Sequence, residues 1–243
     1  MKRLLVAAGI FVFVAAVGFA DDKKNPCITP VERKDKGAVA RHQAFVDRAK
    51  KGDVDALFLG DSITQGWEGA KKTWEAKFGP MKPANFGIGG DRTEHVLWRI
   101  TEGKELEGIS PKVTVLMIGT NNSGSNSPEQ IAEGVGAIVS TLRQKNIKVL
   151  LLGVFPRASL PKEQKDLKVA PAANLNTKIR EINDIIKKMD DGKNIVYMDI
   201  GQKFLTDDGG LSKEIMPDLL HLSPKGYEIW ADAITPKLEE MLK

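Results

Sequence analysis

Short apolar runs alternate with amphipathic segments along most of the chain. Five runs rich in branched residues have the length of buried strands, and they lie at 56–59, 84–88, 113–118, 149–155 and 195–200. Apolar positions at helical spacing lie between them, over 131–142 and 175–189. Near-continuous apolar strands separated by such helices predict an α/β fold with a five-stranded parallel, flavodoxin-like sheet covered on both faces, which is a three-layer α/β/α sandwich.

Helix boundaries are marked by capping residues. An early helix has the apolar face Val39, Phe45, Val46 and Ala49 and is closed by Gly52. Ser127 with Gln130 forms a capping box, and Ser223 opens the last helix in a similar way. Asp91 with Glu94 is expected to cap a third helix.

The first 20 residues have the pattern of a secretory signal. Lys2 and Arg3 precede an apolar stretch over 4–17, and the small residues of 18–20 suit cleavage after Ala20. An uncleaved membrane anchor is the alternative, but the small-residue end favours cleavage and therefore no stable membrane insertion. We expect an exported protein with a signal peptide at 1–20, a polar arm at 21–36 and a single domain at 37–243.

The composition and charge of the chain indicate which kinds of partner it can bind. The 243 residues are 42% hydrophobic, which suits one globular domain. Loss of Lys2 and Arg3 lowers the formal net charge from +4 to +2, and the lysines are mixed with acids, so no nucleic-acid partner is expected. Cys27 is the single cysteine and cannot form an internal disulfide. We interpret it as an unimportant thiol, with a disulfide to a second chain as the alternative.

A serine stands where the first predicted strand ends. Gly60-Asp61-Ser62-Ile63 follows the run 56–59 directly. Reactive groups of α/β proteins lie just beyond the carboxyl ends of parallel strands, and glycine permits the sharp turn that exposes the next side chains. The triplet by itself more often marks a solvated turn, so a nucleophilic Ser62 requires partners elsewhere in the chain.

One of the three histidines is placed in the sequence where it can act as the general base for Ser62. His42 and His95 lie within predicted helices, so packing or surface positions are their simplest interpretation. His221 follows Asp218 by three residues, in a loop before the last helix. Such a carboxylate can hold the imidazole while it takes the proton of Ser62. A solvated loop or a partial metal site is the alternative, but a metal needs more ligands than this pair, so no metal is expected.

Two further loops offer donors for an oxyanion. Residues 87–91 contain three glycines after the second strand, where a backbone N–H can approach a ligand and the next helix start adds positive potential. Residues 119–122 follow the third strand and supply side-chain amides at the same edge of the sheet. Each loop alone is equally consistent with a simple turn at a strand end.

Together these four blocks resemble the SGNH, or GDSL-type, esterase superfamily, over nearly all of the chain after the signal. The resemblance implies the SGNH hydrolase fold and a Ser-His-Asp triad of Ser62, His221 and Asp218. It implies Gly90 and Asn121 as oxyanion-hole donors beside the N–H of Ser62. It implies no organic cofactor and no metal.

Within that superfamily, the sequence of 85–91, 95–99, 119–122 and 218–222 is similar to the catalytic subunits of platelet-activating-factor acetylhydrolase. Ile63 departs from the leucine of the GDSL motif, and Asn122 departs from an aspartate that often follows the asparagine of the third block. The export signal is foreign to that cytosolic enzyme.

The resemblance implies a serine esterase that cleaves short acyl esters, with acetyl groups expected, through an acyl-enzyme intermediate. An acetylated carbohydrate is the expected substrate of an exported enzyme. A phospholipid-directed acetylhydrolase or lysophospholipase is one alternative, and a non-catalytic carbohydrate-binding protein on the same fold is another. Ile63 and Leu220 are expected to line a small acyl pocket. The irregular segment 157–171 is expected at the strand-end side, as part of the pocket wall.

Overall fold

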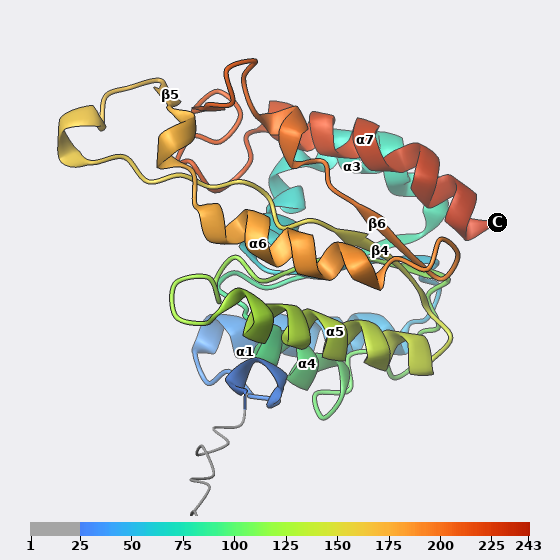
Figure 1. Ribbon diagram of the computed structural model, residues 1–243. Helices are drawn as coiled ribbons and strands as arrows, with labels where there is room; N and C mark the ends of the chain where they lie inside the picture. Colours follow the sequence, from blue (N-terminus) through green and yellow to red (C-terminus); the bar gives the residue numbers. More distant parts are fainter. Residues whose placement is uncertain (1–24) are drawn as a thin grey trace, which may run out of the picture.

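The computed structural model describes residues 25–243 and confirms the three-layer α/β/α sandwich (Figure 1). The central sheet is parallel, and its strand order is β2-β1-β3-β4-β6. In chain order the strands are β1 Ala56–Gly60, β2 Pro83–Gly87, β3 Val113–Met117, β4 Lys148–Leu152 and β6 Ile195–Met198. The expected signal peptide lies outside the described residues. No helix within 25–243 has the length and apolarity that crossing a bilayer requires.

Helices cover both faces of the sheet with separate apolar cores. One face packs against α1 Lys36–Lys50, α4 Thr93–Ile100, α5 Pro128–Gln144 and α6 Thr177–Ile186. The other packs against α3 Lys71–Phe78 and α7 Pro224–Leu242, which lie side by side in Figure 1. Alternate strand residues enter the two cores, so Leu57 faces the first and Phe58 the second. The strands are therefore covered on both sides, as their apolar runs predicted.

The strand order brings three strand ends together. From β1 the chain crosses to β2 on one side and then to β3 on the other, which makes β1 the point where the connections reverse. Gly60 at the end of β1 is in register with Gly87 of β2 and Met117 of β3. Ligands of open α/β sheets bind in the crevice outside such a reversal. The loops after β1, β2 and β3 therefore meet at one edge.

The polar arm is part of the domain from residue 25 onward. Its short 3-10 helix Pro26–Ile28 packs against α4 and α5, and Cys27 is completely buried in the first core. Burial raises the pKa of the Cys27 thiol. A disulfide from Cys27 to a second chain is therefore wrong, because no surface of the side chain is exposed to a partner.

Two further details differ from the sequence predictions. Val39, expected on the buried face of α1, is 43% exposed. The predicted cap of α4 by Asp91 is also wrong: Arg92 precedes the helix, and its backbone N–H donates to His95 Nδ1. Asp91 instead accepts hydrogen bonds from two arginines. The Ser127 capping box and the Ser223 cap are confirmed.

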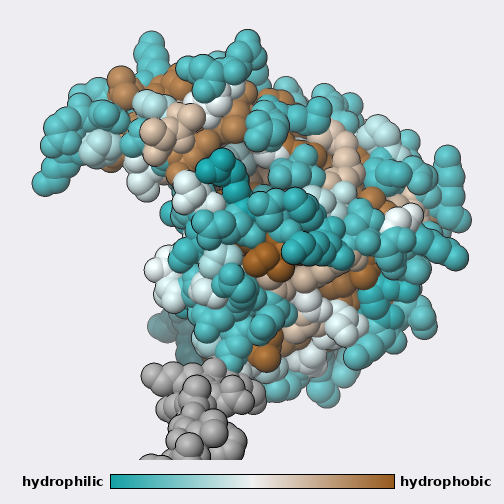
Figure 2. All heavy atoms as spheres, in the orientation of Figure 1, coloured by the Kyte–Doolittle hydropathy of each residue, from teal (hydrophilic) through white to brown (hydrophobic). Residues whose placement is uncertain are grey.

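The segment 157–171 projects beyond the sheet, on the side where α5 and α6 begin (Figure 1). Just before its end, the two-residue strand β5 Val169–Ala170 pairs with β7 Leu211–Ser212 in antiparallel fashion. Leu167 and Val169 are among its exposed side chains. In Figure 2 the projection overhangs a recess on this side of the molecule.

Candidate active site

Ser62 begins the short helix α2 Ser62–Gln65 immediately beyond β1. The carboxylate of Asp61 caps this helix by accepting the N–H of Ile63 at 3.0 Å. Gly60 is required at this turn, because a Cβ there would lie 2.3 Å from Thr64 Oγ1. Asp61 is completely buried, and burial raises its pKa to about 7. Asp61 therefore shapes the turn from below while Ser62 remains partly exposed.

The Ser62 hydroxyl lies within hydrogen-bond distance of His221, although 159 positions separate them. Ser62 Oγ is 2.8 Å from His221 Nε2. On the other side of the ring, His221 Nδ1 is 2.6 Å from Asp218 Oδ2. A hydroxyl joined to an imidazole that is itself held by a carboxylate is the arrangement that activates a serine nucleophile.

The Asp218–His221 loop holds its own carboxylate in place. Asp218 Oδ1 accepts the backbone N–H groups of Leu220 at 3.0 Å and His221 at 2.7 Å. Burial raises the pKa of the Asp218 carboxyl, but the hydrogen bonds from the ring and backbone of His221 outweigh it, so the net pKa lies below its usual value. The side chains of His221 and Asp218 are 43% and 55% exposed. The pair therefore carries its charge at an open surface.

The loop after β2 approaches Ser62 through glycines. A Cβ on Gly87 would lie 2.2 Å from the backbone nitrogen of Gln65, so only glycine permits this contact. The N–H of Gly89 donates to Gln65 Oε1 at 2.7 Å, which ties the glycine loop to the α2 turn. Gly90 is exposed and has φ +81°, a conformation that favours glycine.

Asn121, in the loop after β3, is oriented by the same glycine loop. Its Nδ2 donates to the carbonyl of Asp91 at 2.8 Å, which uses one of its two amide protons. Asn122 is completely buried instead, where its amide contacts Thr93 and Glu94 at the start of α4. The structure thus brings Ser62, Gly90 and Asn121 to adjacent strand ends, while Asn122 anchors the helix behind them.

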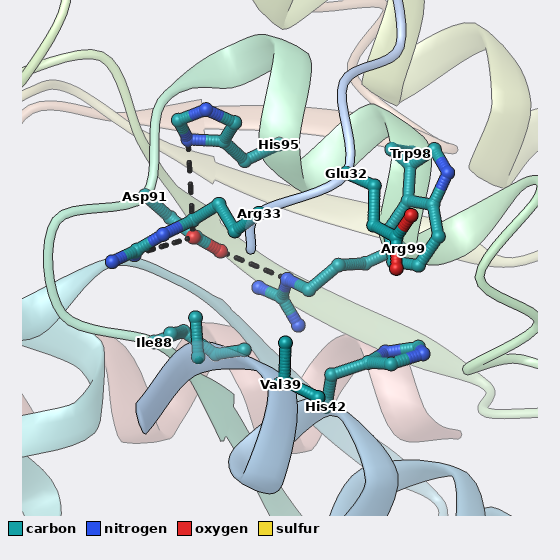
Figure 3. A pocket seen from close by; sticks show the side chains of 10 residues that line it. Glu32, Arg33, Val39, His42, Ile88, Asp91, His95, Trp98 and Arg99 are labelled. Atoms are coloured by element: carbon teal, nitrogen blue, oxygen red, sulfur yellow. Dashed lines mark hydrogen bonds and ion pairs between the residues drawn. The ribbon is translucent and has the colours of Figure 1, made fainter. Parts of the chain in front are cut away.

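A buried cluster of charges supports this edge (Figure 3). Arg99 of α4 is 3% exposed, and its Nε donates to Asp91 Oδ2 at 2.8 Å. Its other nitrogens donate to the Glu105 carboxylate and to the carbonyls of Gly60 and Phe86. Burial opposes the charge of Arg99, but Glu105 and Asp91 raise its pKa overall. One guanidinium therefore ties the ends of β1 and β2 to the glycine loop.

The remaining members of the cluster come from the arm and the nearby helices. Arg33 donates to Asp91 Oδ1 at 3.1 Å and to the carbonyl of Gly89. His42 Nδ1 lies 2.8 Å from Glu105 Oε1. Burial lowers the pKa of His95 below its usual value, in keeping with a neutral ring that accepts from Arg92. The cavity among these side chains measures about 20 Å³, room for a single water molecule.

Several supporting residues were not identified from the sequence. Arg99 and Glu105 lie six positions apart, Gln65 bridges two loops, and the hydroxyl of Tyr227 donates to the carbonyl of Ile63 at 2.7 Å. The one signal available was a charged residue, Arg99, in an otherwise apolar turn of α4. A charged residue in an apolar turn indicates a buried ion pair, but it does not show which residues pair with Arg99.

The two expected acyl-pocket residues lie in different environments. Ile63 is 1% exposed and packs in the core beneath α7, so its side chain presents no surface to a substrate. Its direction follows from the α2 turn, which exposes Ser62 and points the next side chain inward. Leu220 is partly exposed and stands beside His221. Of the two, only Leu220 therefore has surface that a substrate can contact.

This fold and site define an ester hydrolase. Residues 58–229 match the model of the GDSL-like Lipase/Acylhydrolase family, and the chain belongs to that family. Platelet-activating factor acetylhydrolase IB subunit alpha2 of Rattus norvegicus is a relative, 38% identical over 192 residues, which cover 78% of each chain. The alpha1 subunit of Homo sapiens is 35% identical over 212 residues, covering 84% of this chain and 86% of the relative.

Solved structures share the fold at lower identity. A GDSL-like lipase from Bacteroides thetaiotaomicron superposes with a TM-score of 0.64 and 22% identity, covering 83% of this chain and 98% of that one. An acetyl xylan esterase superposes with a TM-score of 0.57 and 24% identity, covering 75% and 98%. These neighbours extend over most of the described chain and agree with its sheet architecture.

Proposed function

We propose that Ser62, His221 and Asp218 form the catalytic triad of a short-chain acyl esterase. The observation that carries this proposal is the continuous contact from Ser62 Oγ to His221 Nε2 at 2.8 Å and from His221 Nδ1 to Asp218 Oδ2 at 2.6 Å. The carboxylate keeps Nδ1 protonated, which leaves Nε2 free to accept the serine proton. Asp61 is the neighbouring carboxylate, but it lies below the turn, where it caps Ile63.

The reaction proceeds through an acyl-enzyme. Ser62 Oγ attacks the carbonyl carbon of the ester as its proton moves to His221 Nε2, which forms a tetrahedral intermediate. Collapse breaks the bond to the alcohol oxygen, and His221 returns the proton to the departing alcohol. Water then attacks the acyl-serine with His221 as its base, which releases the acid and restores Ser62.

The oxyanion of both tetrahedral intermediates is held by the N–H groups of Ser62 and Gly90 and by Asn121. The amide of Asn121 has one proton that its contact with Asp91 leaves free. The positive φ of Gly90 orients the peptide at the outer end of the glycine loop. Donors fixed before the reaction need no reorganisation as charge develops on the oxygen.

The preferred substrate in this proposal is an acetyl ester of a carbohydrate outside the cytoplasm. The signal-like residues 1–20 support export, and the acetyl xylan esterase shares the fold. The 38% identity to platelet-activating factor acetylhydrolase supports the second candidate, a phospholipid-derived acetyl ester. Leu220 beside His221 supports a short acyl group in both cases, because a branched side chain there restricts the space next to the triad.

The test compares purified wild type, Ser62→Ala and Ser110→Ala with 4-nitrophenyl esters from acetyl to decanoyl. Ser110 is an exposed serine before β3, at the opposite edge of the sheet, and serves as the matched control. We expect Ser62→Ala to lose at least ~10⁴-fold in kcat while Ser110→Ala retains full activity. Turnover by Ser62→Ala at the wild-type rate would remove Ser62 as the nucleophile. A wild type most active on decanoyl esters would refute the short-chain preference.

A further inference from the structure

A second cavity lies at the same edge of the sheet as the triad. It measures about 260 Å³ and is formed by the segments that follow β4 and β6, the first turns of α6 and the 3-10 turn Gly201–Phe204. Ser62, His221 and Asn121 do not line it. This volume is near the lower end of ligand pockets, so it suits a small unit such as one sugar ring.

The strand order fixes the direction from Ser62 to this cavity. Ser62 follows β1 and Asn121 follows β3, while the cavity lies beyond the next two strands, β4 and β6. Neighbouring strands are about 4.8 Å apart, which places the cavity roughly 10 to 14 Å along the edge from Ser62. A substrate that reaches both places must be longer than a simple ester and must extend along this edge.

The cavity wall lies against the catalytic loops at two points. Val154 lines the cavity, and its Cγ2 lies 3.5 Å from where a Cβ on Gly119 would stand, two residues before Asn121. Pro156 also lines it, and Ala158 just beyond donates its N–H to the carbonyl of Leu219, two residues before His221, at 3.1 Å. The wall is therefore continuous with the loops that carry Asn121 and His221.

The lining combines polar side chains with an apolar wall. Within residues 25–243, no hydrogen bond or ion pair engages the side chains of Arg180 and Gln202. Asp199 accepts the N–H of Gly201 at 2.8 Å, and its carboxylate also interacts with the phenol of Tyr197, whose pKa is raised by burial and by the charge of Asp199. Leu175 and Leu205 supply apolar surface. The donors and the acceptor can bind the hydroxyl groups of a sugar ring, and the leucines can pack against its C–H face. The opposite charges of Arg180 and Asp199 favour a neutral ring over an anion.

We propose that this cavity binds one neutral sugar unit of an acetylated oligosaccharide whose scissile ester lies at Ser62. The proposal rests on the carbohydrate-ester function given above and adds a second contact along the glycan chain. The distant sugar positions the ester, so the cavity raises kcat/KM for oligosaccharides and has no effect on a small ester that does not reach it.

The experiment either fills the cavity or removes its polar side chains, and it leaves the triad residues unchanged. Ala172→Phe places a ring at the exposed rim, and the double variant Arg180→Ala/Gln202→Ala removes two hydrogen-bonding side chains. Lys71→Ala, which removes an exposed charge near β2, the strand of the sheet farthest from β6, is the control. Each variant is assayed with acetylated xylotriose and with 4-nitrophenyl acetate. Binding of unmodified xylotriose to Ser62→Ala is followed separately by NMR.

We expect both cavity variants to lose roughly tenfold or more in kcat/KM for acetylated xylotriose, mostly through KM, with 4-nitrophenyl acetate unchanged. Equal losses on both substrates would show a structural role and overturn the proposal, as would no loss on either. If the wild type hydrolyses 4-nitrophenyl acetate but not the acetylated sugar, the proposed carbohydrate-ester function is refuted independently of the proposal for the cavity. The sugar-binding proposal for the cavity is then tested by NMR, and absence of xylotriose binding at Arg180 and Gln202 overturns that proposal.

Discussion

The two halves of the candidate site are held in place by different means. The half that carries Ser62, Gly90 and Asn121 lies at three strand ends above a buried charge cluster, in which Arg99 is 3% exposed; Asp61, beside Ser62, is fully buried. The half that carries Asp218 and His221 is one loop before α7, and both side chains are about half exposed. The first half depends on side-chain contacts from distant parts of the chain, whereas the Asp218 carboxylate is held by hydrogen bonds within four residues.

This difference predicts how substitutions divide between chemistry and stability. A change in the exposed loop removes a catalytic contact without leaving a buried group unpaired, so activity should fall and folding should not. A change in the buried cluster leaves charges without partners away from bulk water, so folding should weaken as well. Substitutions in the exposed loop and in the buried cluster therefore test whether effects on activity and on stability separate in this way.

The largest expected effect is that of Asp218→Asn. The amide preserves the shape of the side chain but removes the charge that orients His221, and such a change lowers kcat about 10⁴-fold. We expect the melting temperature to stay within about 2 °C of wild type, because Asp218 is exposed. Hydrolysis of 4-nitrophenyl acetate and thermal unfolding measure the two quantities, with exposed Asp232→Asn as the control. A large fall in melting temperature would show that this loop also supports the fold.

The buried half should respond in the opposite way to Arg99→Met. Removal of the guanidinium leaves Asp91 and Glu105 buried without their main partner, which typically costs about 3–5 kcal/mol of unfolding free energy. Urea unfolding measures this loss, and exposed Arg180→Met is the matched control. An Arg99→Met protein as stable as wild type would mean that the cluster is relaxed by water, and the contrast between the two halves would fail.

The same contrast explains which parts of the site the sequence predicted. Apolar runs predicted the strands because burial on both faces leaves a local pattern, and Asp218 with His221 was visible because the partners are three residues apart. The roles of Arg99 and Tyr227 were not predictable, since their contacts depend on how distant segments pack. Ile63 was expected at the substrate, but only the geometry of the α2 turn shows that its side chain points into the core.

Asn121→Ala tests whether the buried half contributes to the transition state as well as to the fold. Loss of one oxyanion donor lowers kcat by roughly 10²–10³-fold, while KM should remain near its wild-type value. Steady-state kinetics with 4-nitrophenyl acetate separate the two parameters. An exposed asparagine outside the site, in the variant Asn146→Ala, provides the control. A raised KM at constant kcat would instead assign Asn121 to binding of the ground state.

The smallest expected effect concerns Asp61, whose Oδ2 is buried without a hydrogen-bond partner among the described residues. Burial raises the pKa of Asp61 from 3.8 to about 7, so the folded protein retains the proton that the unfolded chain releases. Between those two values the unfolded state binds fewer protons, and the stability of the wild type therefore falls as the pH rises from about 4 to about 7, then levels off.

Asp61→Asn cannot ionise, so its stability relative to wild type should rise across that same pH range, by about 3 kcal/mol between pH 4.5 and 7.5. Urea unfolding of both proteins at pH 4.5 and 7.5 measures the change, and Asp232→Asn, which alters an exposed aspartate, is the control. A difference that is equal at both pH values would mean that water reaches the Asp61 carboxylate. The nucleophile turn would then be as open as the histidine loop, and the two halves of the site would differ only in how far along the chain their contacts reach.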